Sequence, residues 1–393
     1  MPTITKTGVR NITILSGSTM TVLAGALLAP SLPDMALAFQ DVPNAEFLVM
    51  LTLTMPALFI ALGSPFAGIL LDKLGRKPVL IVSLILYGIS GTSGFFVDSL
   101  FGILVGRAFL GLAVAGIMSG FTTLIADYFT GPQLNKFMGY QGAAIGLGGM
   151  VSFILAGFLA DIGWRLPFLI YLAAFIVLPG VLLSIDEPVR LKATEGKDQR
   201  ASAPFPLKPF VMIYSITFAS MAIFFLIPIL LPFYLTLEGG VSNSQVGIAL
   251  AAQTLTSIIM ALLYYRLRAR LSFLSLAAFV FLFLGINNVI ISITPVYSVV
   301  VVALLIGGLG LGILPPNLGA WVASTAPPSM RGRAVGGFTM FLFLGQFASP
   351  LIIQPFVQQF GFAGAFLGAG AVSMILTIVI VGFVLYNRLQ RKQ

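Results

Sequence analysis

The sequence of 393 residues contains no cysteine and no histidine, and these two absences remove several kinds of chemistry. Disulfides and thiol nucleophiles require cysteine, while zinc sites and haem groups commonly use cysteine or histidine ligands. We therefore expect no disulfide, no catalytic thiol and no Cys/His metal site, and we expect the protein to work without a cofactor.

Charge is scarce as well. Asp, Glu, Lys and Arg make up 8% of the residues, whereas hydrophobic residues make up 58% and the mean hydropathy is +1.05. A soluble domain carries about 25% charged residues, so much of this surface must face lipid. The apolar runs are long and unbroken, unlike the ~10-residue alternating segments of a membrane β-barrel. The composition predicts an all-α membrane protein.

Twelve apolar segments are long enough to cross a bilayer, which takes ~20 residues. They lie at residues 12–36, 47–71, 78–97, 101–126, 137–160, 165–185, 210–236, 245–265, 272–293, 297–324, 335–357 and 363–386.

Basic residues are concentrated at the chain ends and in every second loop between these segments. If the N-terminus lies in the cytoplasm, all of the 21 Lys and Arg residues except Arg107 and Arg165 fall on the cytoplasmic side. This asymmetry follows the positive-inside rule and predicts two cytoplasmic termini in a bacterial inner membrane. It also explains the net charge of +9 without a nucleic-acid partner.

The chain divides into two halves of equal length. A polar, proline-containing stretch at residues 186–208 separates residues 1–185 from residues 209–393, with six predicted spans on each side. Such a stretch is typical of a linker, and matching halves indicate an internal duplication. We expect two pseudo-symmetric six-helix bundles with a solute site between them.

One motif follows the second span. Residues 68–77 read GILLDKLGRK, which matches the pattern G-x-x-x-D-[RK]-x-G-R-[RK] of the loop between helices 2 and 3 in the major facilitator superfamily. Gly68 and Asp72 share one helical face, where a small residue permits a close neighbour and a carboxylate can pair or cap. A contact made in only one conformation would bias the alternation between states. The alternative is a basic turn that only directs membrane insertion.

Other segments resemble the twelve-helix drug:proton antiporter branches of the same superfamily. They are residues 30–34 (PSLPD), 106–111 (GRAFLG), 164–168 (WRLPF) and 331–336 (RGRAVG). The G-P-x-x-G-G signature of those branches is incomplete, because residues 152–157 read SFILAG. Gly142, Gly146, Gly149, Phe153 and Gly157 still share a face suited to close helix packing. The resemblance implies the major facilitator fold and transport by alternating access, while the direction of transport stays open.

The resemblance also implies conformational roles, which we assign to Gly68, Asp72, Gly75, Arg76, Lys77 and Gly111.

Arg107 and Asp34 lie inside predicted spans, whereas Arg165 is the first residue of its span. A buried Arg is expensive in a membrane, roughly 2.5–3.5 kcal/mol on insertion scales, so Arg107 must find a partner or a wet cavity. Asp34 is the nearest candidate acid. Desolvation favours a protonated carboxyl and a nearby guanidinium favours the carboxylate, so this pair is our candidate for proton coupling. The alternatives are an Arg bound only to backbone carbonyls and a solvated Asp at a helix end.

A facilitator cavity would be lined by polar and aromatic residues of several spans. The candidates for substrate binding are Arg107, Gln141, Tyr214, Phe218, Gln253, Asn317, Trp321 and Phe341. With 34 Phe and 14 Met, an adaptable apolar pocket for a lipophilic solute is favoured.

We therefore predict a monomeric secondary transporter in contact with membrane lipids that exports small lipophilic compounds in exchange for protons. The alternative within transport is a carrier of a metabolite, such as a sugar or an organic anion, or of a lipid. A sensor or an enzyme is disfavoured, because the sequence has no long soluble segment, no phosphate-binding loop and no buried acid pair.

Overall fold

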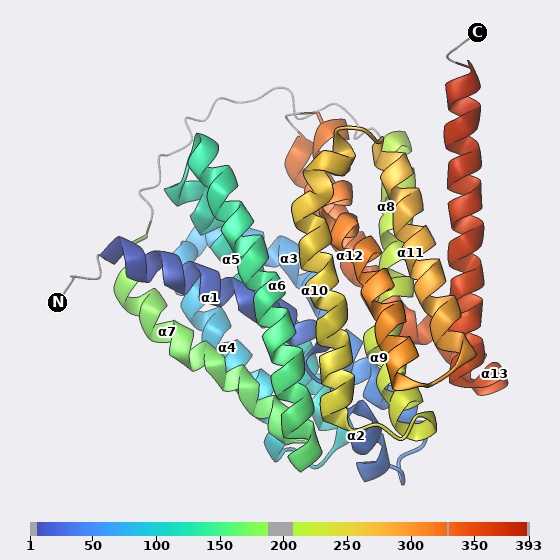
Figure 1. Cartoon of the computed structure of the whole chain (residues 1–393). Helices are drawn as coiled ribbons and strands as arrows, with labels where there is room; N and C mark the ends of the chain where they lie inside the picture. The colour runs from blue at the N-terminus through green and yellow to red at the C-terminus, as the bar shows by residue number, and fades with distance from the viewer. Residues whose placement is uncertain (1–5, 188–206, 328–329, 391–393) are drawn as a thin grey trace.

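The computed structural model describes residues 6–187, 207–327 and 330–390, and within them the chain is helical with no strand (Figure 1). The first half contains α1 (Lys6–Ala26), η1 (Ala29–Ser31), α2 (Leu32–Ala38), α3 (Ala45–Leu74), α4 (Arg76–Phe96), α5 (Leu100–Tyr128), α6 (Gly131–Ile162), η2 (Leu166–Leu172) and α7 (Ala173–Ser184). The second half contains α8 (Leu207–Phe224), α9 (Leu226–Phe233), η4 (Tyr234–Glu238), α10 (Asn243–Arg268), α11 (Phe273–Ile293), α12 (Tyr297–Thr325) and α13 (Arg331–Gln390).

The described residues contain twelve membrane crossings, as predicted. In the described ranges, eleven helical segments are long and apolar enough to span a bilayer. One of them, α13, has 60 residues and would be about 90 Å long if straight, roughly three times the hydrocarbon thickness. It turns at Gly361, whose φ of 69° is not helical, so α13 crosses twice (Figure 1).

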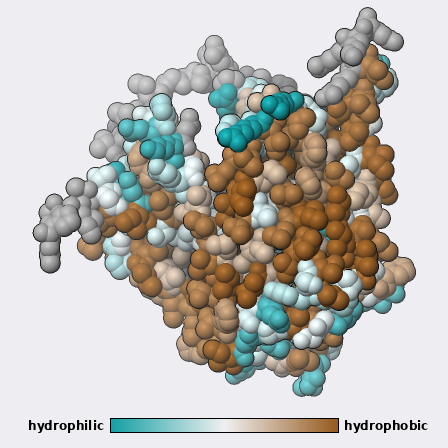
Figure 2. Space-filling view, in the orientation of Figure 1, coloured by the Kyte–Doolittle hydropathy of each residue, from teal (hydrophilic) through white to brown (hydrophobic). Residues whose placement is uncertain are grey.

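The outer surface matches a lipid environment. Figure 2 shows hydrophobic side chains over the middle of the molecule and hydrophilic ones toward its two ends. Large apolar side chains are open on this surface, including Ile176 at 81% and Leu183 at 78% exposure. Burying that much apolar area requires lipid rather than water, so the chain is an integral membrane protein.

The two halves touch mainly at the end of the molecule that carries α2, here called the α2 face. The opposite end, where residues 187 and 207 bound the linker, is called the linker face. Helix α6 packs against α10, and α3 against α13. Near the α2 face, a Cβ added to Gly157 of α6 would lie 2.7 Å from the carbonyl oxygen of Asn243 in α10. Glycine is therefore required for this close backbone contact.

Toward the linker face the halves separate. Gly139 and Gly142 of α6, and Gly332 and Gly336 of α13, have no atom within 4 Å of an added Cβ. Figure 1 shows α6 and α10 converging toward the α2 face and diverging toward the linker. The structure is thus closed at the α2 face and open at the linker face.

Candidate functional site

A cavity of about 320 Å³ lies between the halves. Its walls come from α1, α3, α5 and α6 of the first half and from α8, α9, α10, α12 and α13 of the second. It is lined by Thr21, Val22, Gly25, Ala26, Ala57, Ile60, Met118, Ile145, Gly146, Gly149, Phe153, Met221, Phe224, Phe225, Pro228, Leu250, Gln253, Thr254, Leu311, Pro315, Leu342, Phe343 and Gln346. None of these lining residues is charged, and most are aliphatic or aromatic.

Two glutamine side chains in the cavity wall have amide Nε2 groups with no oxygen or nitrogen acceptor among the described residues. Gln253 is 3% exposed, and its Nε2 is buried without a hydrogen-bond partner. The Nε2 of Gln346 contacts only the Sδ of Met221, at 3.9 Å. By contrast, the hydroxyls of Thr21 and Thr254 donate to carbonyls of their own helices, at 2.8 and 3.0 Å. A bound molecule would therefore find two amide groups in an apolar wall.

Of the eight residues proposed from sequence for substrate binding, Gln253 lines this cavity. Gln141 instead donates to the Ser18 hydroxyl at 2.9 Å, and Asn317 donates to the Phe273 carbonyl at 3.0 Å.

The aromatic candidates pack elsewhere in the second half. Tyr214 donates to the Ala334 carbonyl and stacks on Phe341, with ring centroids 5.1 Å apart. Trp321 stacks on Phe273, and the Phe218 backbone lies against Gly345. Substrate contact by these residues stays a prediction for other states of the protein.

Most residues of the cavity wall are not among those predicted from the sequence. A usable signal was helical spacing from Gln253 and Gln346, because residues three or four positions away share a face with them. That rule leads from Gln253 to Leu250, and from Gln346 to Leu342 and Phe343, all of which line the cavity.

Arg107 of α5 is 1% exposed and binds carbonyl groups of two other helices. Its Nε donates to the Thr52 carbonyl of α3 at 2.7 Å, and its Nη2 donates to the Ala24 carbonyl of α1. Proline has no N–H, so Pro56 leaves the Thr52 carbonyl without its helical donor. Ala24 lies in the last turn of α1, where carbonyls also lack helical donors. The guanidinium therefore donates to two backbone carbonyls that lack a donor within their own helices.

A glycine and a tyrosine hold Arg107 in this position. A Cβ on Gly111 would lie 2.5 Å from the Pro56 carbonyl, so the absence of a side chain lets α5 approach α3. The third donor group, Nη1, bonds the Tyr171 hydroxyl at 2.7 Å. In the described part of the chain no carboxylate pairs with Arg107, so its charge is balanced by dipoles only.

Asp34 is engaged with the other half of the protein instead. Its Oδ2 accepts from the Nδ2 of Asn243, the first residue of α10, at 2.6 Å. Asp161 of α6 accepts from the backbone N–H of Ser244 at 3.2 Å. Two carboxylates of the first half thus hold the N-terminal turn of α10, where anions are favoured. The structure does not bring Asp34 and Arg107 into contact.

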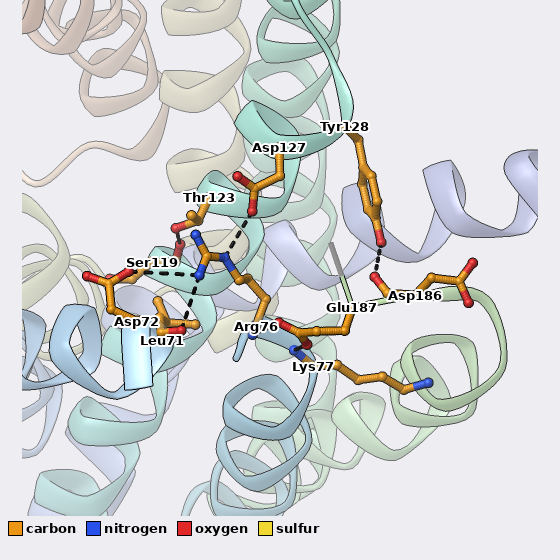
Figure 3. A network of polar contacts seen from close by, with 10 residues as sticks. All are labelled: Leu71, Asp72, Arg76, Lys77, Ser119, Thr123, Asp127, Tyr128, Asp186 and Glu187. Atoms are coloured by element: carbon orange, nitrogen blue, oxygen red, sulfur yellow. Dashed lines mark hydrogen bonds and ion pairs between the residues drawn. The ribbon is translucent and has the colours of Figure 1, made fainter. Parts of the chain in front are cut away.

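The motif at residues 68–77 forms a polar network on the linker face (Figure 3). Arg76 is 17% exposed; its Nε bonds the Asp127 carboxylate at 2.9 Å, and its Nη1 lies 3.8 Å from Asp72. The Asp72 side chain is 80% exposed, and Gly68 has no atom within 4 Å of an added Cβ. The close neighbour that we expected beside Gly68 is absent in this state.

Gly75 and Glu187 determine the geometry of the turn between α3 and α4. Gly75 has φ 105°, which favours glycine, and an added Cβ would lie 2.6 Å from the Glu187 carboxylate. That carboxylate accepts from the backbone N–H groups of Arg76 and Lys77, at 2.7 and 2.8 Å, and so caps α4 (Figure 3). Lys77 donates its Nζ to the Leu182 carbonyl at 2.7 Å.

Asp186, next to Glu187, contacts the start of α1. The Lys6 ammonium hydrogen-bonds its carboxylate at 2.7 Å and thereby lowers the pKa of that carboxyl. Its backbone carbonyl accepts from the Tyr128 hydroxyl at the end of α5. The first residues of the predicted linker are thus bound to three helices, while residues 188–206 lie outside the described ranges.

Comparison with known sequences gives a match to the family model described as Major Facilitator Superfamily, twice, over residues 14–237 and 212–393. The chain is 33% identical over 165 residues to multidrug resistance protein 1 of Bacillus subtilis, a match covering 38% of this chain and 40% of that relative. It is 25% identical over 398 residues to an uncharacterised transporter of the major facilitator type from Methanocaldococcus jannaschii, covering 97% and 99% of the two chains.

Among solved structures, a crystal structure of a D-xylose-proton symporter superposes with a TM-score of 0.77 at 14% identity. The superposition covers 95% of this chain and 96% of that one. At this identity the likeness concerns the fold.

Proposed function

The chain belongs to the Major Facilitator Superfamily, so it is a membrane carrier and not an enzyme, and we propose that it exports small lipophilic compounds in exchange for protons. The observation that carries the proposal is the charge-free, largely apolar cavity between the halves. Apolar walls with a few polar groups are typical of sites for lipophilic ligands. The partial match to a multidrug resistance protein supports the same substrate class.

Transport by alternating access would exchange the present state for its opposite. Here the cavity is closed at the α2 face by the α6–α10 contact and open toward the linker face. The distribution of basic residues supports a cytoplasmic linker face, with both termini cytoplasmic in a bacterial inner membrane. On this assignment the described state faces the cytoplasm and would load substrate from inside the cell or from the inner leaflet.

The gating role proposed for Gly68, Asp72, Gly75, Arg76, Lys77 and Gly111 acts in that exchange. Asp72 and Gly68 are free of packing from the second half here, which suits residues that make contacts when the linker face closes. Arg76 already bridges α4 to Asp127 of α5, so it would move with the first half as a rigid unit.

Proton coupling would use Asp34, with Arg107 as a fixed charge in the same half of the protein. The Asp34 carboxylate accepts a hydrogen bond from Asn243 across the closed α2 face. Protonation would remove the negative charge and weaken this bond, favouring separation of the halves there. Arg107 would hold α1 and α3 in place during the change, through the Ala24 and Thr52 carbonyls.

A single chain would be sufficient for this activity, since both halves of the cavity wall come from it. We therefore propose a monomer with bundles at residues 1–185 and 209–393, joined by the linker at 186–208.

The test is accumulation of two fluorescent lipophiles, one neutral (Nile red) and one cationic (rhodamine 123), in cells with and without the protein. Export predicts lower accumulation of at least one dye, restored to the control level by a protonophore. Lower accumulation that persists with the protonophore would refute proton coupling. Equal accumulation of both dyes, with the protein verified in the membrane, would favour the metabolite carrier.

A further inference from the structure

The cavity wall carries a chemical preference that goes beyond lipophilicity and rests on the proposed transport site. We infer that its substrates are uncharged molecules with a hydrogen-bond acceptor, such as a ring carbonyl, and that the amide groups of Gln253 and Gln346 select them.

The first observation is the state of the two amides. The Nε2 group of Gln253 is a donor buried without a partner, and that of Gln346 has only a sulfur at 3.9 Å. Leaving a buried donor unpaired is unfavourable, so an acceptor that enters the cavity gains more there than in a wall of satisfied groups. Both Nε2 groups are donors, so a substrate that supplies an acceptor can pair with them.

The second observation is the absence of negative charge. No Asp or Glu is among the lining residues, so a cation that leaves water for this cavity finds no counter-charge. A neutral molecule loses much less hydration on the same transfer. The cavity therefore favours neutral over cationic lipophiles of equal size.

The third observation is a buried positive charge behind the wall. Arg107 binds the Ala24 carbonyl, and the next two residues of α1, Gly25 and Ala26, line the cavity. No carboxylate neutralises this guanidinium within the described segments. Its field disfavours cations further, while its 1% exposure and three bound acceptors withhold it from anions.

The experiment compares three tricyclic probes of similar size in protein-containing nanodiscs, with empty nanodiscs as the partition control. Fluorenone carries a carbonyl acceptor, fluorene has a methylene in its place, and N-methylacridinium is a cation. Binding of radiolabelled fluorenone is measured directly and by competition with the other two. One hydrogen bond predicts a preference of about two- to twelvefold for fluorenone over fluorene, with N-methylacridinium weakest.

Substitutions test which side chain causes the preference for fluorenone over fluorene. Gln253→Leu should reduce the fluorenone preference but retain fluorene binding, and the retained binding itself shows an intact cavity. Gln253→Glu should raise the affinity for N-methylacridinium at least tenfold. The matched control is Gln354→Leu, which removes an amide with an unpaired Oε1 that does not line the cavity, and it should keep the preference.

Equal affinity of the wild type for all three probes, tighter binding of N-methylacridinium, or binding of none would overturn the inference. So would an unchanged preference in Gln253→Leu. Because binding in nanodiscs needs no proton gradient, these outcomes are separate from the dye-export test. Loss of export with an intact fluorenone preference would refute the transport proposal alone.

Discussion

A valine at position 157 should push the protein out of the state described here. Gly157 packs against the first turn of α10, and an added Cβ would lie 2.7 Å from the Asn243 carbonyl oxygen and 2.9 Å from the Ser244 Cα. Both atoms belong to backbone, which cannot rotate away as a flexible side chain can. In a state that opens the α2 face, α6 and α10 separate and the valine has room.

The size of the effect follows from the overlap. Overpacking of a tight interface typically destabilises it by about 1–3 kcal/mol. Since the strain exists only in the state closed at the α2 face, the ratio of the two states should shift by roughly 5- to 150-fold. We expect Gly157→Val to be well inserted but biased toward the state open at the α2 face.

The assay uses the absence of cysteine from the natural sequence. A single Leu250→Cys, at a cavity-lining position with 2% exposure, reports which side gives access. A membrane-impermeant maleimide is applied to intact cells and to inverted vesicles. Gly157→Val should raise the labelling rate in intact cells at least fivefold and lower it in inverted vesicles.

Valine substitutions at two further glycines serve as comparisons for Gly157→Val. Gly142 lies on the same face of α6 but has no atom within 4 Å of an added Cβ, because the halves have separated there. If they close at that end in the opposite state, Gly142→Val should shift labelling the other way. Gly382→Val, on an exposed stretch of α13, should leave both rates unchanged. Unaltered labelling in Gly157→Val, with normal expression, would refute the reasoning.

Three other substitutions test the remaining contacts. Arg107→Lys keeps the charge, but a lysine cannot reach the three acceptors on α1, α3 and η2. The loss of two charged hydrogen bonds should destabilise the protein by about 3–6 kcal/mol. Thermal unfolding in detergent measures this loss, and an unchanged melting temperature would contradict it. Gly75→Ala adds a Cβ where the Glu187 carboxylate lies, at an unfavourable φ, and should slow dye export more than Glu187→Gln does. Asp34→Asn keeps an acceptor for Asn243 but cannot bind a proton, so dye accumulation should become insensitive to protonophore while membrane insertion stays normal.

The architecture was predictable because its causes act along the chain. Segment length and hydropathy are set by the bilayer thickness, and the equal halves follow from counting spans on either side of the polar stretch. The predicted spans at 335–357 and 363–386 correspond to the two parts of α13, on either side of Gly361. Local motifs were also informative, since residues 68–77 form a turn between two helices, with Gly75 at a positive φ.

The cavity wall was much less predictable. Of the candidates for substrate contact, Gln253 lines the cavity, whereas Phe341 packs on Tyr214 and its neighbour Leu342 lines the wall. One position along an α-helix turns a side chain by about 100°, so membership of the wall depends on how each helix is rotated about its axis. That rotation is decided by packing against several neighbours at once.

Composition and spacing by themselves determined that this protein spans a membrane twelve times in two halves, because a bilayer constrains each segment independently. Only the tertiary structure decided which groups meet. Arg107 reaches carbonyls that Pro56 and the end of α1 leave open, and Glu187 caps a helix 111 residues away in the chain. Such contacts join helices that are distant in sequence, and their geometry depends on the packing of the whole bundle.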